Sequence, residues 1–197
     1  FEPHPRSFFK PHQPVFRLTP LPLKVRLAAA LGASFVLSLN FDKALSMLEP
    51  QDFIQQYLVE KMKAAHVVTG YDFHFGRGRK GNPAILKEFG RQRGFAVTVV
   101  DQVADEDDSH SPFSSSSIRS ALRRGHMAAA ARELGYYWTV MGKVVKGDHR
   151  GRAIGFPTAN IVLEEGAEPI RGIFTVRVRD GIKKNSTAWG GAGYFGN

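Results

Sequence analysis

Residues 146–160 have the types and the spacing of a phosphate and metal site. Three glycines let backbone amides approach a phosphate closely, while Lys146 and Arg152 supply positive charge for its oxygens. A Pro-Thr-x-Asn turn follows, and the Thr158 hydroxyl and the Asn160 amide oxygen are hard ligands of the kind that Mg²⁺ takes beside phosphates. The segment therefore predicts a nucleotide-phosphate and Mg²⁺ site.

Three earlier segments also combine residue types suited to ligand binding. Residues 1–5 read Phe-Glu-Pro-His-Pro, and the two prolines stiffen a loop that presents a histidine. Residues 70–81 follow an apolar run and hold glycines, aromatic rings, one carboxylate and three cations, which suit a base, a ribose and phosphates. Residues 114–119 place serine hydroxyls at an expected helix start ahead of Arg119, where they would face an anion.

Each of these segments also has a plain structural interpretation. A lone histidine in a loop can be exposed and idle, and His4 has no carboxylate or cysteine partner at metal-ligand spacing, so zinc is excluded. Residues 70–81 fit equally a glycine-rich hairpin whose phenylalanines fill the core. The serine run also fits a helix cap.

Composition and charge limit the classes of protein. The chain has 197 residues, 43% of them hydrophobic, no cysteine and a net charge of +9. The absence of cysteine excludes disulfides and thiolate metal sites and fits a reducing cytoplasm, where we expect the protein to work. No apolar run approaches the roughly 20 residues of a membrane span. The charge could serve nucleic acid, a membrane surface or phosphorylated small molecules. The basic residues lie in short groups beside glycines, which favours discrete phosphate pockets over a continuous duplex footprint, although a solvated basic surface remains an alternative.

Apolar periodicity predicts alternating strands and helices up to about residue 134. The expected elements are strands at 35–39, 66–70 and 95–100, and helices at 50–63, 82–93, 118–124 and 128–134. This order favours a parallel sheet with crossover helices, which binds ligands at the carboxyl ends of its strands. Residues 101–112 are acidic and rich in turn formers, and we expect an exposed loop there.

The pattern changes after Tyr136. Residues 138–145 and 172–179 alternate between apolar and other residues, and 189–195 are rich in glycine and aromatic residues. No long helical pattern occurs in this part, which is typical of a small antiparallel β domain. We expect the domain boundary near residues 135–138.

In this order the four segments resemble the bifunctional riboflavin kinase/FMN adenylyltransferase family, the prokaryotic FAD synthetases. The resembling motifs are Phe-x-Pro-His-Pro, Gly-x-Asp-Phe-x-Phe-Gly, Ser-Ser-Ser-x-Ile-Arg and Gly-Arg-x-x-Gly-Phe-Pro-Thr-Ala-Asn. The resemblance implies an α/β Rossmann-like nucleotidyltransferase domain over residues 1–135. A small antiparallel β-barrel of the riboflavin kinase type, with six strands, would follow over residues 136–197.

The resemblance also implies two reactions, both displacements at phosphorus. One phosphorylates riboflavin to FMN with the γ-phosphoryl group of ATP, and the other joins FMN to the AMP part of ATP, giving FAD. The implied ligands are riboflavin, FMN and ATP, with Mg²⁺ as cofactor and no nucleic acid or membrane as partner. Two alternatives remain at this point: a chain that keeps only one of the two activities, and a basic nucleic-acid-binding module.

Site residues follow from the matching motifs. In the first domain, the residues implied at the flavin and nucleotide are Phe1, Pro3, His4, Pro5, Asp72, Phe73, Phe75, Ser114, Ser115, Ser116 and Arg119. In the kinase domain, those implied around the nucleotide are Gly142, Lys143, Gly147, Arg152, Gly155 and Pro157. Thr158 and Asn160 are the implied Mg²⁺ ligands.

The chain departs from the family pattern at both ends. The family's first strand and its His-x-Gly-His loop lie upstream of Phe-x-Pro-His-Pro, and the proposed kinase base is a Glu downstream of the barrel's Gly-Asn turn. Neither is among these residues, so the catalytic residues are not identified here. We therefore expect a fragment that lacks both features, and near inactivity of these residues alone in both reactions.

Overall fold

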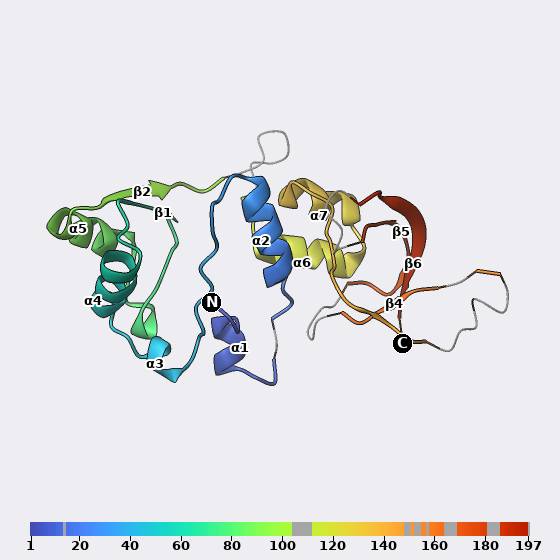
Figure 1. Ribbon diagram of the computed structural model, residues 1–197, viewed down its shortest axis with the longest axis horizontal. Helices are drawn as coiled ribbons and strands as arrows, with labels where there is room; N and C mark the ends of the chain where they lie inside the picture. The colour runs from blue at the N-terminus through green and yellow to red at the C-terminus, as the bar shows by residue number, and fades with distance from the viewer. Residues whose placement is uncertain are drawn as a thin grey trace. The chain divides into compact units, whose positions relative to one another are not determined.

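The computed structural model describes residues 1–13, 15–103, 112–147, 151, 155–156, 158–163, 169–180 and 186–196. Contacts divide the chain into two compact units, and Figure 1 follows its elements by colour from the N-terminus to the C-terminus. The first unit comprises residues 1–11 and 38–113, and the second comprises 12–37 and 114–197. This division by contacts does not coincide with the sequence boundary expected at 135/136, which stays a prediction.

The first unit is built on two parallel strands joined by a crossover helix. Strands β1 (His66–Gly70) and β2 (Ala96–Val100) pair in parallel, from His66 opposite Ala96 to Gly70 opposite Val100. Helix α5 (Pro83–Arg93) connects them (Figure 1). The predicted strand–helix–strand unit is therefore confirmed, and the segment from residue 70 to 81 begins at the carboxyl end of β1.

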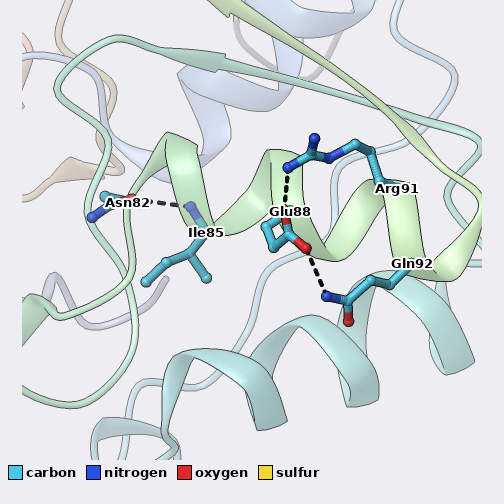
Figure 2. A network of polar contacts seen from close by, with 5 residues as sticks. All are labelled: Asn82, Ile85, Glu88, Arg91 and Gln92. Carbon is cyan, nitrogen blue, oxygen red and sulfur yellow. Dashed lines mark hydrogen bonds and ion pairs between the residues drawn. The ribbon is translucent and has the colours of Figure 1, made fainter.

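Local sequence explains why α5 begins and ends where it does. Asn82 caps its start, with Oδ1 accepting from the Ala84 and Ile85 amides at 3.0 and 3.1 Å, and Gly94 ends it in the left-handed conformation. Figure 2 shows this cap beside a network around Glu88, which accepts hydrogen bonds from Gln92 and Arg91. The bond from Gln92 and the charge of Arg91 lower the pKa of Glu88.

The predicted helix over residues 50–63 is confirmed, but its winding differs from a regular α-helix. It starts as α4 (Pro50–Phe53) and continues as a π-helix, η1 (Ile54–Lys61). A buried cluster of this unit consists of Ile54, Phe75, Leu86 and Phe95. It therefore joins the π-helix, the loop after β1, helix α5 and the residue just before β2.

The strand expected at residues 35–39 is not formed. This stretch has no partner strand along its length in the described structure, and only its end is held, through Glu2. The Glu2 amide donates to the Leu39 carbonyl at 2.9 Å, and the Phe41 amide donates to the Glu2 carbonyl at 2.8 Å. Among the described residues, periodicity did not indicate three α-helices, α1 (Pro5–Phe9), α2 (Leu21–Ala30) and α3 (Lys43–Ser46), or the short 3-10 helix η2 (Arg77–Arg79).

The second unit has a helix pair at its core. Helices α6 (Ser115–Arg124) and α7 (Met127–Leu134) end at Gly125 and Gly135, both in the left-handed conformation, as predicted. Their buried residues pack with others from the segment 12–37; the cluster is Phe16, Leu18, Ile118, Ala121, Leu122 and Ala130. Trp138 packs against this cluster, with its ring edge-to-face on Phe16 at 5.7 Å.

The β part of the second unit contains two antiparallel pairs in the described residues. Short strands β3 (Val144–Val145) and β4 (Asn160–Ile161) form one pair. Longer strands β5 (Gly172–Val178) and β6 (Trp189–Phe195) form the other. The antiparallel prediction is confirmed for these strands, but residues 138–143 are not in a strand, and the described strands do not close into a barrel.

No helix within the described residues has both the length and the apolar character needed to cross a membrane.

Candidate functional site

The N-terminal motif, residues 1–5, is held in the first unit by backbone hydrogen bonds and leads into helix α1. His4 caps α1, with its ring Nδ1 accepting a hydrogen bond from the Arg6 amide at 3.1 Å. Pro5 is the first residue of that helix, where a proline costs no hydrogen bond. Because Glu2 is paired with residues 39–41, the aromatic ring of Phe1 is brought against the first unit's own side chains.

These side chains form an aromatic array, which we define by its ring contacts. Centroid separations lie between 5.2 and 6.3 Å, and the members are Phe1, Phe8, Phe9, Phe41, Phe53, Tyr57, Phe73 and Phe75. Phe1 and Phe9 are 43% and 64% exposed, whereas Phe75 is 5% exposed. The array therefore runs from the core of the unit to its surface. A hollow of about 170 Å³ adjoins it at Tyr57 and is lined also by Asn40, Asp42, Ala44, Leu45, Leu48 and Gln56.

The segment after β1 divides its residues between core and surface. Phe75 is buried, and its backbone pairs with Gly81 in both directions, which closes a loop. Phe73 is partly buried and stacks on Phe75 at 5.4 Å. Asp72 is exposed, and its carbonyl accepts from the His74 ring at 2.8 Å. Phe75 thus fills the core, as the structural interpretation of this segment predicts. Asp72 is exposed on the surface, where a ligand could reach it.

Ser114 caps α6, its hydroxyl accepting from the Ser117 amide at 3.1 Å, and Ser115 and Ser116 are exposed in the first turn. Arg119 lies one turn further on. Its Nε donates to the Phe16 carbonyl at 2.7 Å, and its Nη1 donates to the Ser115 carbonyl at 3.1 Å. The guanidinium is therefore an anchor between α6 and the segment 12–37, a role that the motif did not indicate.

The C-terminal motif brings two pairs of predicted residues together. A Cβ added to Gly147 would overlap the side-chain amide nitrogen of Asn160. One added to Gly151 would overlap the Phe156 carbonyl oxygen first and would stand 3.0 Å from the Thr158 methyl group. Gly147 therefore makes room for the side chain of a proposed Mg²⁺ ligand, whereas Gly151 makes room mainly for the backbone at Phe156. A Cβ added to Gly142 would overlap the Ile161 side chain and would stand 3.1 Å from the Val162 carbonyl oxygen.

Thr158, Asn160 and Lys143 are exposed, and Gly155 has a φ of +82° with open space around it. Arg152 and Pro157 lie outside the described residues. The donor set, a hydroxyl and an amide oxygen on a glycine-lined turn, fits Mg²⁺ beside phosphate oxygens.

The structure groups the predicted residues by unit. Phe1, Phe73 and Phe75 come together in the first unit through Phe53, and the residues around Asn160 come together in the second. The serine-led helix belongs to the second unit. The sequence motifs did not predict five members of the array, Phe8, Phe9, Phe41, Phe53 and Tyr57. The spacing of Phe53 and Tyr57, four residues apart in a helix, is the signal that could have joined those two.

Comparisons with known proteins match the chain over nearly all its length. The sequence profile of the FAD synthetase family matches residues 1–116, and that of the riboflavin kinase family matches residues 134–194. A "Bifunctional riboflavin kinase/FMN adenylyltransferase" from Escherichia coli K12 is 36% identical over 178 residues, which is 90% of this chain and 56% of that protein. A protein of the same name from Listeria monocytogenes is 38% identical over 181 residues, 91% of this chain and 56% of its own length.

The chain thus spans about half the length of the curated relatives it matches. A solved structure described as a macrolide-efflux protein from Streptococcus pneumoniae has a TM-score of 0.73 and 29% identity, over 91% of this chain and 55% of that one. The FAD synthetase match covers more than half of the 197 residues, and the riboflavin kinase match covers the segment that holds the fourth motif. The chain therefore belongs to the FAD synthetase family.

Proposed function

We propose that the chain serves two successive reactions, the phosphorylation of riboflavin to FMN by ATP and the adenylylation of FMN to FAD. The observation that carries this proposal is the order of the two profile matches on one chain, FAD synthetase first and riboflavin kinase second. The relatives from E. coli and L. monocytogenes, which bear both activities in their names, align across both segments.

We assign the flavin to the aromatic array of the first unit. An isoalloxazine ring is flat and apolar on its faces, so it gains most by stacking on or packing against aromatic rings. The exposed rings of Phe1 and Phe9 offer such faces, while Phe53 and Phe75 hold the array from beneath. Phosphates of FMN and ATP would find cations nearby in the same unit, on the loop after Phe75.

We assign the ATP phosphates of the kinase reaction to the glycine-lined turn of the second unit. Gly147 and Gly151 bring the backbone close to Asn160 and Thr158, which would hold Mg²⁺ through their side-chain oxygens. Mg²⁺ held there would neutralise phosphate charge during transfer of the terminal phosphoryl group. Lys143 is exposed and directly precedes β3, and it would add a positive charge for the phosphates.

We also propose that β3 to β6 belong to the six-stranded kinase barrel of the family, with the domain boundary at 135/136. Their antiparallel pairing and their position inside the riboflavin kinase match support this.

Ligand binding is the direct test, because the family's His-x-Gly-His loop is not within these residues. FMN titrated with the chain should lose fluorescence, and Mg²⁺-ADP should bind in calorimetry. A second arm incubates the chain with riboflavin, ATP and Mg²⁺ and separates FMN from FAD by chromatography. Formation of one product alone would support the single-activity alternative. Failure to bind FMN and ATP, together with salt-sensitive binding of duplex DNA, would refute the proposal in favour of a nucleic-acid module.

A further inference from the structure

A loop with three cations follows Phe75, and its shape is set by the backbone. We call residues 76–81 the cationic loop; it carries Arg77, Arg79 and Lys80. The Gly81 amide donates to the Phe75 carbonyl at 2.9 Å, and the Phe75 amide donates back at 3.2 Å, so the ends of the loop are joined. None of these contacts involves a charged side chain.

A further backbone contact ties the cationic loop to the start of α4. The Arg77 amide donates to the Leu48 carbonyl at 2.7 Å. Gly76 has a φ of +71°, and an added Cβ would stand 2.9 Å from the Pro50 nitrogen, so only glycine fits there. The loop is therefore held in place whether or not its cations are paired.

Glu49, at the N-cap position of α4, is the anion that the cations meet. One carboxylate oxygen lies 3.6 Å from Arg77 Nη1, and the other lies 3.6 Å from Lys80 Nζ. All three side chains are about half exposed, so these ion pairs are weak and screened by salt. Arg79 makes no ion pair or side-chain hydrogen bond within the described residues.

We infer that the cationic loop is a polyphosphate-binding subsite and that Glu49 is its internal counter-anion, which a polyphosphate displaces. The inference deepens the proposed function and rests on it for the identity of the natural ligand. The loop carries three positive charges, of which Glu49 offsets one. A tripolyphosphate chain has enough charge and oxygens to replace the carboxylate at Arg77 and Lys80 and to reach Arg79 as well. Orthophosphate is too small to make all these contacts.

The counter-anion role predicts a gain of affinity when Glu49 is neutralised. Because backbone contacts hold the loop, Glu49→Gln should leave its shape intact and remove only the competing charge. We expect inorganic tripolyphosphate to bind Glu49→Gln about threefold more tightly or better at low salt, with the gain shrinking as NaCl rises. A residue that only ordered the loop would give a loss of affinity instead.

Calorimetric titration of the full chain with tripolyphosphate and with orthophosphate tests this. Glu60→Gln is the matched control, because it removes the same charge from the same unit. The Glu60 carboxylate accepts a hydrogen bond from Gln55 at 2.9 Å and is not the carboxylate that meets Arg77 and Lys80. Arg79→Gln should weaken tripolyphosphate binding about tenfold, and Arg91→Gln, which removes a cation paired with Glu88 on α5, should not.

Unchanged or weaker binding by Glu49→Gln, or an equal gain in Glu60→Gln, overturns the counter-anion. Unchanged binding by Arg79→Gln overturns the subsite even where the chain still binds FMN, which leaves the proposed function standing. A wild-type chain that binds tripolyphosphate through Arg79 but neither FMN nor ATP supports the subsite and refutes the proposed function, so the two failures are distinguishable.

Discussion

Alanine at position 147 probes whether the turn before β4 holds a metal–nucleotide complex. The added Cβ would overlap the amide nitrogen of Asn160 and stand 3.1 Å from its Cγ. Real Cβ atoms essentially never come closer than 3.0 Å to a heavy atom outside their own residue and its two neighbours in the chain. The amide must therefore turn away or shift by about 1 Å, a displacement large enough to disturb a metal ligand. Asn160 is exposed, so the movement leaves the core intact.

The expected cost of Gly147→Ala follows from the displaced ligand. Mispositioning a ligand typically lowers metal affinity about 10–100-fold, or about 1.4–2.8 kcal/mol. Titration of wild-type and variant chains with Mg²⁺-ADP measures this, and thermal unfolding by circular dichroism checks that the fold is kept. Gly190→Ala in β6 is the matched control, because nothing lies within 4 Å of its added Cβ. Equal affinity in wild type and Gly147→Ala, or an equal loss in Gly190→Ala, would refute the reasoning.

Three further predictions concern the first unit and the helix pair. Arg119→Lys keeps the positive charge but cannot keep both carbonyl contacts. It should therefore lower the free energy of unfolding by about 1–3 kcal/mol, measured by urea titration. A loss of ATP affinity at unchanged stability would contradict the anchor role. Phe9→Ala should weaken FMN binding about threefold to tenfold in fluorescence titration, with little change in melting temperature because Phe9 is 64% exposed. Glu88→Gln should be less stable than wild type at neutral pH. Since the folded pKa of Glu88 is lowered from 4.5, its stabilisation is present above that value and is lost as the pH falls through the lowered pKa, so the two urea midpoints should converge in acid.

Local signals were enough to predict the elements that end in clear caps. Helix α5 has Asn82 before it and Gly94 after it, and α6 has Ser114 and Gly125 in the same positions. The parallel pairing of β1 and β2 could also be predicted, because two neighbouring strands joined by a crossover helix run in the same direction. In these places local preference and tertiary structure agree.

The features that sequence did not predict depend on distant partners or fine geometry. Residues 35–39 have strand-forming side chains but no neighbour to pair with along their length in the described structure. The π-type winding of η1 lies too close to the α period for eight residues to distinguish. Arg119 meets the Phe16 carbonyl 103 positions away, and no local pattern announces such a contact.

The helix pair α6 and α7 has a consequence for how the two halves of the chain evolve. Its core is completed from both sides, by Phe16 and Leu18 of the segment 12–37 and by Trp138 from beyond residue 135. The Ile170 amide also donates to the Leu122 carbonyl at 3.1 Å. A split of the chain between residues 135 and 136 would keep these buried residues on one product but would separate them from Trp138 and from the Ile170 amide. A single reading frame therefore keeps the helix pair together with the two contacts that residues beyond 135 make to it.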